Sequence, residues 1–235
     1  MRQGESDLVY RADEWYLYTT VNYIEPAPDE PDDFLGVDLG IVNLATDSDG
    51  AMYMGGAIER KRRIHMHRRR NLQRKGTRSA RRKLKRLSGK QARYQSGTNH
   101  TISKRIVAHA QGTKRGIALE NLTGIRARTT VKRRQRARHA NWSFYQLGSY
   151  IRYKAQAAGV CVVDVNPRHT SQRRHACGHT KKANRHSQSS FLCQSCGHSA
   201  LADHNAALNL AFLARAAVTL PMVSVARDQG QEHDL

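Results

Sequence analysis

Alternating apolar and aromatic positions near the start of the chain predict a β-hairpin. Its strands are residues 7–10 and 15–21, and the polar residues 11–14 form the turn between them. Residues 25–33 follow as an acidic, proline-bearing linker with too little apolar content to join a core. A new folding unit is therefore expected to open after residue 33.

This unit begins with a strand at residues 34–40 that is apolar on both faces apart from Asp38. Residues 46–50 have the composition of a turn, because Asp, Ser and Gly favour the backbone angles that turns need. Residues 51–54 follow as the next strand. The pattern predicts an antiparallel pair.

Residues 57–111 contain no proline and are rich in Arg, Lys, Gln, Ala and Leu, which predicts two or three long helices. Gly76–Thr77 and Ser88–Gly89 are the expected interruptions. Apolar residues are sparse, so most of the helical surface is charged. These helices should lie against nucleic acid or solvent.

Two further apolar strands, residues 116–120 and 160–165, flank a helix predicted from residue 142 to residue 158. Asn141 is a good N-cap for this helix, and Gly159 would close it. The alternation of strands and helices indicates an α/β layer architecture.

The charge of the chain indicates a negatively charged binding partner, because 40 Lys and Arg residues against 19 acids give a net charge of +21. Of the 19 acids, 12 lie in residues 1–50, whereas residues 57–138 hold 28 Lys and Arg but only Glu59 and Glu120. Without a polyanion these like charges would repel one another, so DNA or RNA is favoured over a merely solvated face. The candidate phosphate contacts are Arg68, Arg69, Arg70, Arg81, Arg82, Lys83, Arg133 and Arg134.

A membrane location is not expected. No apolar run approaches the roughly 20 residues that a spanning helix requires. The first residues resemble neither a signal peptide nor a transit peptide. We therefore expect a cytosolic protein.

Three acids stand out by their context: Asp38 inside an apolar strand, Glu120 at the end of another, and Asp203 at the start of the alanine-rich helix 205–217. Burying a carboxylate is costly unless it is paired or coordinates a cation. If the strands are neighbours and the helix packs over them, the acids would hold one or two Mg²⁺ for phosphodiester hydrolysis.

Each acid also has a simpler interpretation. Asp203 would be only a helix N-cap, and Glu120 only a strand-end residue beside a turn. Asp38 would be a carboxylate satisfied by nearby backbone N–H groups. The spacing alone leaves these alternatives open.

Four cysteines in a basic intracellular protein favour metal ligands over a disulfide framework. Cys193 and Cys196 lie in a Cys-x-x-Cys-Gly knuckle, whose glycine lets backbone N–H groups approach the thiolates of a tetrahedral Zn²⁺. Cys177 lies sixteen residues before Cys193. Cys161 stands apart in an apolar strand and is expected to be a small buried residue.

The first half of this zinc ribbon is incomplete, because a matching pair would place a cysteine where the chain has Arg174. His175 or His179 would supply the fourth ligand, and His198 is another candidate. We expect one Zn²⁺ at a degenerate site. The alternative is a ribbon that has lost its metal or holds it weakly.

The order of these motifs resembles the RuvC-like nuclease domain, with its inserted zinc ribbon, of the transposon-encoded TnpB (OrfB) family. The resemblance rests on residues 36–40, on 118–122, on 170–172 leading into the knuckle, and on 202–209. Members of this family have long been described as transposases and are relatives of the type V CRISPR nucleases. The match runs from about residue 8 to residue 213.

The resemblance implies a ribonuclease-H-like α/β fold and an RNA-guided DNA endonuclease that uses one RuvC-like site with Mg²⁺, two ions being expected. Its partners would be DNA and a guide RNA, in a prokaryotic cytoplasm and on the nucleoid when bound. Asp38, Glu120 and Asp203 match the three catalytic acids, and Cys177, Cys193 and Cys196 match three of the four zinc ligands.

The same resemblance divides the chain into seven segments. They are a residual wedge-domain hairpin and linker (1–33), RuvC-like part I (34–56), a basic helical insertion (57–112), RuvC-like part II (113–168), the zinc ribbon (169–201), the RuvC-like part III helix (202–218) and a disordered tail (219–235). Family members ordinarily carry a longer N-terminal part with a recognition lobe, so an N-terminal truncation is expected here.

The leading hypothesis is thus a TnpB-type, Mg²⁺-dependent endonuclease core. One alternative is a non-catalytic, nucleic-acid-binding remnant of such a protein. Another is a basic zinc-ribbon protein that acts only on RNA.

Overall fold

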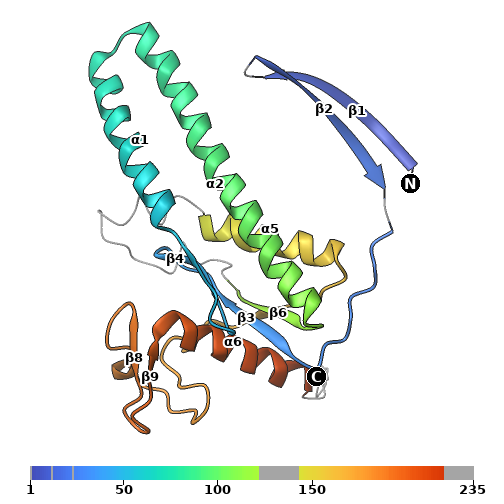
Figure 1. Ribbon diagram of the computed structural model, residues 1–235, viewed down its shortest axis with the longest axis vertical. Helices are drawn as coiled ribbons and strands as arrows, with labels where there is room; N and C mark the ends of the chain where they lie inside the picture. Colours follow the sequence, from blue (N-terminus) through green and yellow to red (C-terminus); the bar gives the residue numbers. More distant parts are fainter. Residues whose placement is uncertain (1, 12, 23, 122–142, 220–235) are drawn as a thin grey trace, which may run out of the picture.

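A five-stranded mixed sheet forms the centre of the computed structural model, which describes residues 2–11, 13–22, 24–121 and 143–219 (Figure 1). Its strands are β3 (Phe34–Asp38), β4 (Asn43–Asp47), β5 (Met52–Met54), β6 (Gly116–Glu120) and β7 (Val162–Val165), in the order β5-β4-β3-β6-β7. Strands β3, β6 and β7 are parallel, and β4 and β5 add an antiparallel edge. The predicted α/β class is confirmed.

Helices cover both faces of this sheet. On one face, α2 (Arg78–Gly112) and α5 (Ser143–Ala157) bury residues such as Ile106 and Ile151 against Leu35 and Leu119. On the other face, α6 (Ala202–Thr219) packs Leu210 and Ala214 against Phe34 and Ala118. Neighbouring strand residues thus enter opposite layers, as the period of two in a strand requires.

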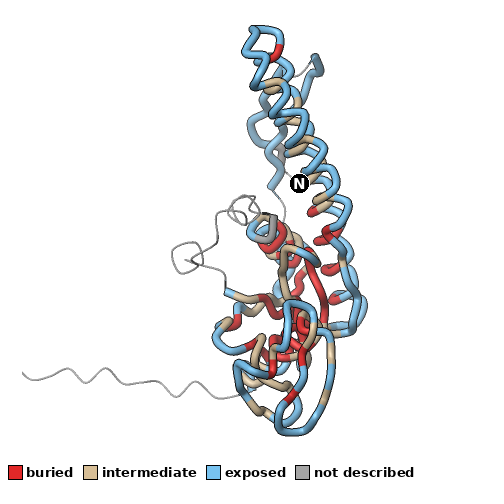
Figure 2. Tube along the Cα trace, turned by 90° about the vertical axis from the view of Figure 1, so that its left-hand side faces the viewer, coloured by how far each residue is buried: buried red, intermediate tan, exposed pale blue. Residues whose placement is uncertain are grey.

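A pair of long helices projects from this core. Helix α1 (Gly56–Lys75) has no buried residue, and the buried residues of α2 lie mostly in its C-terminal half. Figure 2 shows most of the burial around the sheet, and the far end of the helical pair is exposed apart from Ala80. The prediction of charged, solvent-facing helices is confirmed for this segment.

The turn between the two helices is where the sequence places it. Gly76 adopts the left-handed conformation that ends α1, with φ of 63°, and the Thr77 side chain accepts a hydrogen bond from the Ala80 N–H to begin α2. The second predicted interruption, Ser88–Gly89, is wrong, because α2 runs through it unbroken. One glycine costs a helix only about 1 kcal/mol, and the strong helix formers around it compensate.

The strand pair predicted between residues 34 and 54 also needs correction. Strand β4 lies between β3 and β5 and includes Thr46 and Asp47, which the sequence places in a turn. Both side chains are buried. The Asp47 carboxylate accepts hydrogen bonds from the backbone N–H groups of Asp49 and Ala51. Asp47 therefore stabilises the β4–β5 turn, although it is itself the last residue of β4.

The predicted hairpin is present and longer than expected. Strands β1 (Arg2–Arg11) and β2 (Glu14–Asn22) pair antiparallel, and the described side chains of both strands are exposed. The segment 169–201, predicted as a zinc ribbon, contains a 3-10 turn (Lys182–Asn184) and the antiparallel strands β8 (Ser190–Leu192) and β9 (Ser199–Leu201). Strand β9 runs directly into α6.

Three predicted features lie outside the described residues: the basic stretch 126–138 with Arg133 and Arg134, the N-cap Asn141, and nearly all of the tail 219–235. Within the described residues, no helix is long and apolar enough to span a membrane.

Helix α6 lies directly on β3 at Gly36. A Cβ atom built on Gly36 would stand 1.9 Å from the Ala207 carbonyl oxygen and 2.6 Å from the Ala211 backbone nitrogen. The contact therefore requires a glycine on the strand and small residues on the helix, and both partners are backbone atoms that cannot rotate away.

Gly36→Ala should accordingly push α6 off the sheet and lower the free energy of unfolding by about 3 kcal/mol, the upper part of the range for overpacking. Chemical denaturation measures this. Gly56→Ala is the matched control, because a Cβ there meets no atom within 4 Å and stability should be unchanged or slightly higher. Equal stabilities of the two variants would contradict the close-contact account.

Candidate active site and metal centre

The parallel pairing of β3 with β6 places two acids at adjacent strand ends. Gly36 pairs with Ala118 and Val37 with Leu119, so Asp38 and Glu120 stand at the carboxyl ends of neighbouring strands. Alternation along each strand puts Asp38 on the side of Gly36, and Glu120 on the side of Ala118, which is the face that α6 covers. Both acids therefore meet the N-terminal part of α6.

Asp203 lies in the first turn of α6, one residue after the helix begins at Ala202. It is thus inside the helix rather than at the N-cap position. The carboxylates of Glu120 and Asp203 are both electrostatic neighbours of Asp38. The structure brings the three sequence-predicted acids to one end of the sheet.

The surroundings of Asp38 strongly disfavour its charged form. Burial first, and then the nearby carboxylates of Glu120 and Asp203, raise the pKa of Asp38 from 3.8 to about 8, although the Arg185 guanidinium opposes them. Burial also raises the pKa of Glu120, against the effects of the Thr170 hydroxyl and Arg185. An added cation would relieve this excess of buried negative charge.

Neutral donors and one arginine position two of the three acids. The Asn43 side-chain amide donates to Asp203 Oδ2 at 2.9 Å, and the Thr170 hydroxyl donates to Glu120 Oε1 at 2.9 Å. Arg185 Nη2 lies 4.0 Å from Asp203 Oδ1. Sequence reasoning missed Asn43 and Arg185, which no motif singles out, whereas Thr170 lies in one of the motifs quoted above.

Asp38 differs from the other two acids, because no residue in the described part of the chain donates a hydrogen bond to its carboxylate. Backbone N–H groups therefore do not satisfy it, as the simpler interpretation required. A partly buried carboxylate without a donor, beside two others, has the chemistry of a divalent-cation ligand.

The three acids do not form a closed cluster. Among the residues that the structure describes, the one group of three or more ligand atoms lying within 4.8 Å of one another consists of the thiols of Cys177, Cys193 and Cys196. The carboxylates are electrostatic neighbours at a longer separation. The geometry can hold a cation only if their oxygens draw inward around it.

Two buried asparagines of α6 fix the loop that carries Thr170. Asn209 donates to the carbonyl oxygens of Thr170 at 2.8 Å and of Arg173 at 2.7 Å, and Asn205 donates to Arg173 at 2.8 Å. The helix that carries Asp203 therefore also sets the position of the hydroxyl on Glu120. The packing of α6 and the geometry around Glu120 are linked through this loop.

The sulfur positions in the thiol cluster match a tetrahedral metal site. Cys177 Sγ lies 3.7 Å from both Cys193 Sγ and Cys196 Sγ. A tetrahedral zinc with bonds of about 2.3 Å separates its sulfurs by about 3.8 Å. Hydrogen bonds from the backbone N–H of Cys196 and then of Ser195 lower the pKa of Cys193 to about 7, although its burial acts against them.

Arg174 occupies the position of a cysteine in a second, intact knuckle. In the cysteine knuckle, Cys193 N–H donates to the His198 carbonyl and Gly197 N–H to the Cys193 carbonyl. The same two bonds recur around Arg174, which donates to the His179 carbonyl and accepts from Gly178 N–H. The turn thus has the hydrogen bonds of the cysteine knuckle, with Arg174 at the position that corresponds to Cys193.

The histidines stay outside the thiol cluster within the described residues. The His175 ring contacts the Arg174 guanidinium. Burial is the main cause that lowers the pKa of His175, and the positive charge of Arg174 lowers it further. His179 Nε2 is buried without a hydrogen-bond partner. The prediction of His175 or His179 as the fourth ligand stays a prediction.

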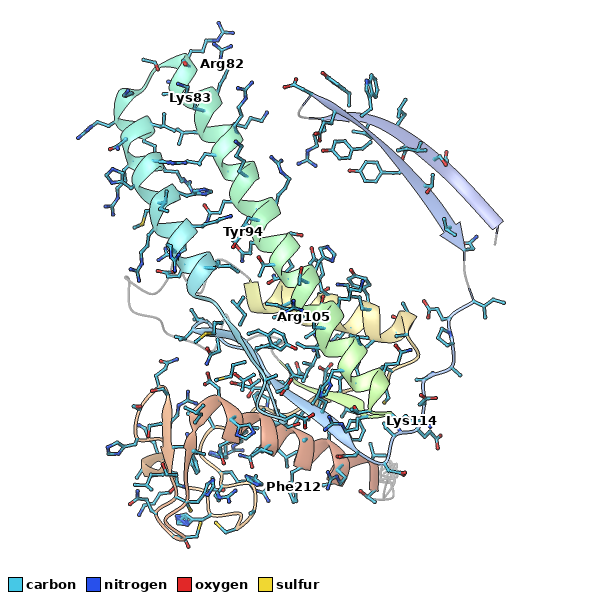
Figure 3. The ribbon with its side chains drawn as sticks, viewed as in Figure 1. Arg82, Lys83, Tyr94, Arg105, Lys114 and Phe212 are labelled. Atoms are coloured by element: carbon cyan, nitrogen blue, oxygen red, sulfur yellow. The ribbon has the colours of Figure 1, made fainter. Side chains whose placement is uncertain are left out.

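The predicted phosphate contacts on the helical pair are exposed. They lie in the last turns of α1 and the first turns of α2: Arg68, Arg69, Arg70, Arg81, Arg82 and Lys83. Figure 3 shows Arg82 and Lys83 at the far end of the helical pair, away from the sheet.

The sequence of this chain is similar to those of known protein families. A family model described as "Probable transposase" matches residues 15–123, and one described as "Cas12f1-like, TNB domain" matches residues 144–210. The CRISPR-associated endodeoxyribonuclease Cas12f1 of Sulfoacidibacillus thermotolerans is 36% identical over 220 residues, which are 86% of this chain and 50% of that protein. A TnpB-like protein of Methanocaldococcus jannaschii is 32% identical over 114 residues, 48% of this chain and 40% of that protein.

The fold agrees with these relatives. A cryo-EM structure of a Cas12f1–sgRNA–target DNA complex matches with a TM-score of 0.62 and 19% identity, covering 87% of this chain and 55% of that chain. The chain is a TnpB-type relative of the type V CRISPR nucleases. It spans about half the length of the Cas12f1 relative that it matches.

For this TnpB-type chain, pH should act on stability through Asp38. Because its folded pKa is raised, the folded state keeps a proton that the unfolded state loses between pH 3.8 and about 8, so metal-free stability should fall as pH rises through this window. Asp38→Asn should make stability less dependent on pH in this window. At pH 8, Mg²⁺ should restore the stability of the wild type but should not change that of the variant. Thermal unfolding in chelator measures the pH effect, and thermal unfolding in excess Mg²⁺ without chelator measures the effect of the ion. Asp164→Asn is the control in both. If the stability of all three proteins falls equally with pH, the raised pKa of Asp38 is contradicted.

The thiol cluster predicts about one zinc per chain. Cys193→Ser should abolish zinc binding, whereas Arg174→Cys should restore a four-cysteine site and strengthen it, because the turn there already has the knuckle's hydrogen bonds. Metal analysis gives the stoichiometry, and competition with a chromogenic chelator gives the affinity. Wild-type protein purified without chelator that contains no zinc would remove the claim.

Proposed function

We propose that this chain carries the catalytic unit of a TnpB-type, Mg²⁺-dependent DNA endonuclease with a ribonuclease-H-like core. The observation that carries the proposal is the Asp38 carboxylate. It has no hydrogen-bond donor among the described residues, and it lies with Glu120 at the ends of two parallel strands, near Asp203. The names of the relatives, which include an endodeoxyribonuclease, support the same chemistry.

Asp38, Glu120 and Asp203 would hold the divalent ions. When bound, two Mg²⁺ supply Lewis-acid activation of water and neutralise the charge that develops on a phosphodiester during hydrolysis. Thr170 orients Glu120, and Asn43 orients Asp203, through the hydrogen bonds described above. Such supporting donors typically change activity by about 10- to 100-fold.

Arg185 has a second role in this proposal. Its guanidinium faces Asp203 at 4.0 Å and acts electrostatically on Asp38 and Glu120. Without cations it offsets part of their negative charge. Once cations neutralise the acids, the same guanidinium is free to contact a phosphate oxygen of the substrate.

The basic helices α1 and α2 would bind the nucleic-acid backbone. We propose DNA and a guide RNA as partners, since the matching Cas12f1 structure is a complex with both. We further propose that residues 169–201 form a zinc ribbon between the nuclease segments, with Cys177, Cys193 and Cys196 as three of its ligands. A cytoplasmic location follows from such partners.

A cleavage assay with matched variants tests the proposal. Labelled single-stranded DNA and guide-targeted duplex DNA are incubated with Mg²⁺ and wild-type protein, Asp38→Ala, or Asp164→Ala. Asp164 is an acid on the neighbouring strand β7 that forms a surface ion pair with Arg152, so its removal should change little. Asp38→Ala should abolish cleavage, and Thr170→Val should slow it by about 10- to 100-fold.

The alternative is a nucleic-acid-binding protein without catalysis. It is favoured by the fact that, among the described residues, the three carboxylates do not form a closed cluster of ligand atoms. In that case the wild type and Asp38→Ala would leave both substrates equally intact while still binding them. This outcome would overturn the proposal.

A further inference from the structure

A groove of about 670 Å³ lies between the edge strand β5 and helix α2. Its volume is within the range of about 300–1,000 Å³ that small-ligand sites occupy. It is lined by Met52, Tyr53, Met54, Arg93, Tyr94, Gly97, Thr98, Thr101, Ile102 and Arg105. None of the three carboxylates or the three metal-site cysteines belongs to this lining, so the groove is separate from both sites.

Residues of the edge strand β5 line one side of the groove. Met52 and Met54 are 46% and 74% exposed, and Tyr53 lies between them on β5. Tyr94 stands on α2 opposite, with the Lys61 ammonium 3.3 Å from its ring centroid. Thioether and ring surfaces of this kind favour a flat, polarisable ligand.

Three of the α2 residues that line the groove have small side chains: Gly97, Thr98 and Thr101. A Cβ atom built on Gly97 would meet no atom within 4 Å, so this position faces open space. The hydroxyls of Thr98 and Thr101 donate to the carbonyl oxygens of Tyr94 and Gly97 in their own helix. These polar groups are already satisfied and leave this side of the groove without competing donors.

Positive charge flanks the groove without opposing acids. Arg93 and Arg105 are exposed on α2, and neither forms an ion pair with an acid in the described residues. Figure 3 places Tyr94 and Arg105 along the same helix. The acid that acts on Tyr53, Asp47, is buried and bonded to backbone N–H groups.

A second groove provides a contrast. It has a volume of about 410 Å³ and lies between α1 and α2, where Arg68, Lys75, Lys83, Arg86 and Lys90 contribute cations but no tyrosine, phenylalanine or tryptophan is present. Its chemistry suits phosphates alone. The groove at β5 combines cations with rings and thioethers, which suits a nucleotide.

We propose that the β5–α2 groove binds an unpaired nucleobase of a single strand, with Arg93 and Arg105 contacting the adjacent phosphates. A base in this groove rests against Tyr53, Tyr94 and the two methionines, and the space over Gly97 accommodates its thickness. Stacking of this kind tolerates any base, because every base has a flat π-face. The inference rests on the proposed function only for the nature of the partner, and it requires no cleavage.

Binding to two strands of equal length separates this site from general attraction to phosphate. One is a fluorescein-labelled oligothymidine, and the other is an abasic strand with the same phosphates and no bases. Fluorescence anisotropy in chelator, without Mg²⁺, reports binding independently of catalysis. Wild-type protein should bind the strand with bases about fivefold or more tightly, the lower end of the effect of one stacked base.

Gly97→Leu should abolish this preference, because it fills the groove and removes no existing side chain. Gly112→Leu is the matched control on the same helix, since a Cβ there also meets no atom within 4 Å. It should retain the preference. Lys83→Gln, in the cationic groove, should weaken binding of both strands equally, by one phosphate contact.

Circular dichroism confirms that each variant is folded. Two outcomes would overturn the inference: wild-type protein that binds both strands equally, or a folded Gly97→Leu that keeps the preference of the wild type. Neither outcome bears on the cleavage assay, which depends on Asp38.

Discussion

The contact between α6 and β3 at Gly36 is the constraint on which the rest of the structure depends. Only a residue without a side chain allows the backbone of Ala207 to lie so near the strand. This approach places Asp203, one helical turn before Ala207, near Asp38, two residues after Gly36. Wider packing would separate the carboxylates and leave the end of the sheet without a site.

The same closeness creates an electrostatic problem. Asp38, Glu120 and Asp203 gather negative charge where burial already disfavours it, and the pKa of Asp38 rises to about 8 as a result. The Arg185 guanidinium offsets only part of this negative charge. The chain has a large excess of Lys and Arg, yet three acids lie together at this point. Bound cations would offset the cost of placing their charges together.

The segment 169–201, which carries the thiol cluster, contributes to this site through contacts with α6 and with the acids. Asn205 and Asn209 of α6 bind the loop that enters the region, and that loop presents Thr170 to Glu120. Arg185 comes from the same region. The backbone hydrogen bonds around Arg174 match those of the cysteine knuckle and keep this loop in place.

Much of the fold could be predicted from the sequence, because apolar runs and helix-forming stretches are long and clearly bounded. The Gly76–Thr77 turn was predictable, since a left-handed glycine followed by a capping threonine has a local signature. Strand β4 was not, because Thr46 and Asp47 are turn-forming types that the tertiary structure buries. Motif order singled out the three acids, but Asn43 and Arg185 reach the site only through contacts remote in sequence.

The most direct test is an anomalous-scattering map from crystals of the wild-type protein grown with Mn²⁺. The account predicts a peak contacted by Asp38, Glu120 and Asp203, with the three side chains drawn closer together than in the metal-free protein. A map without a peak there, or with the three carboxylates directed to separate regions, would contradict it.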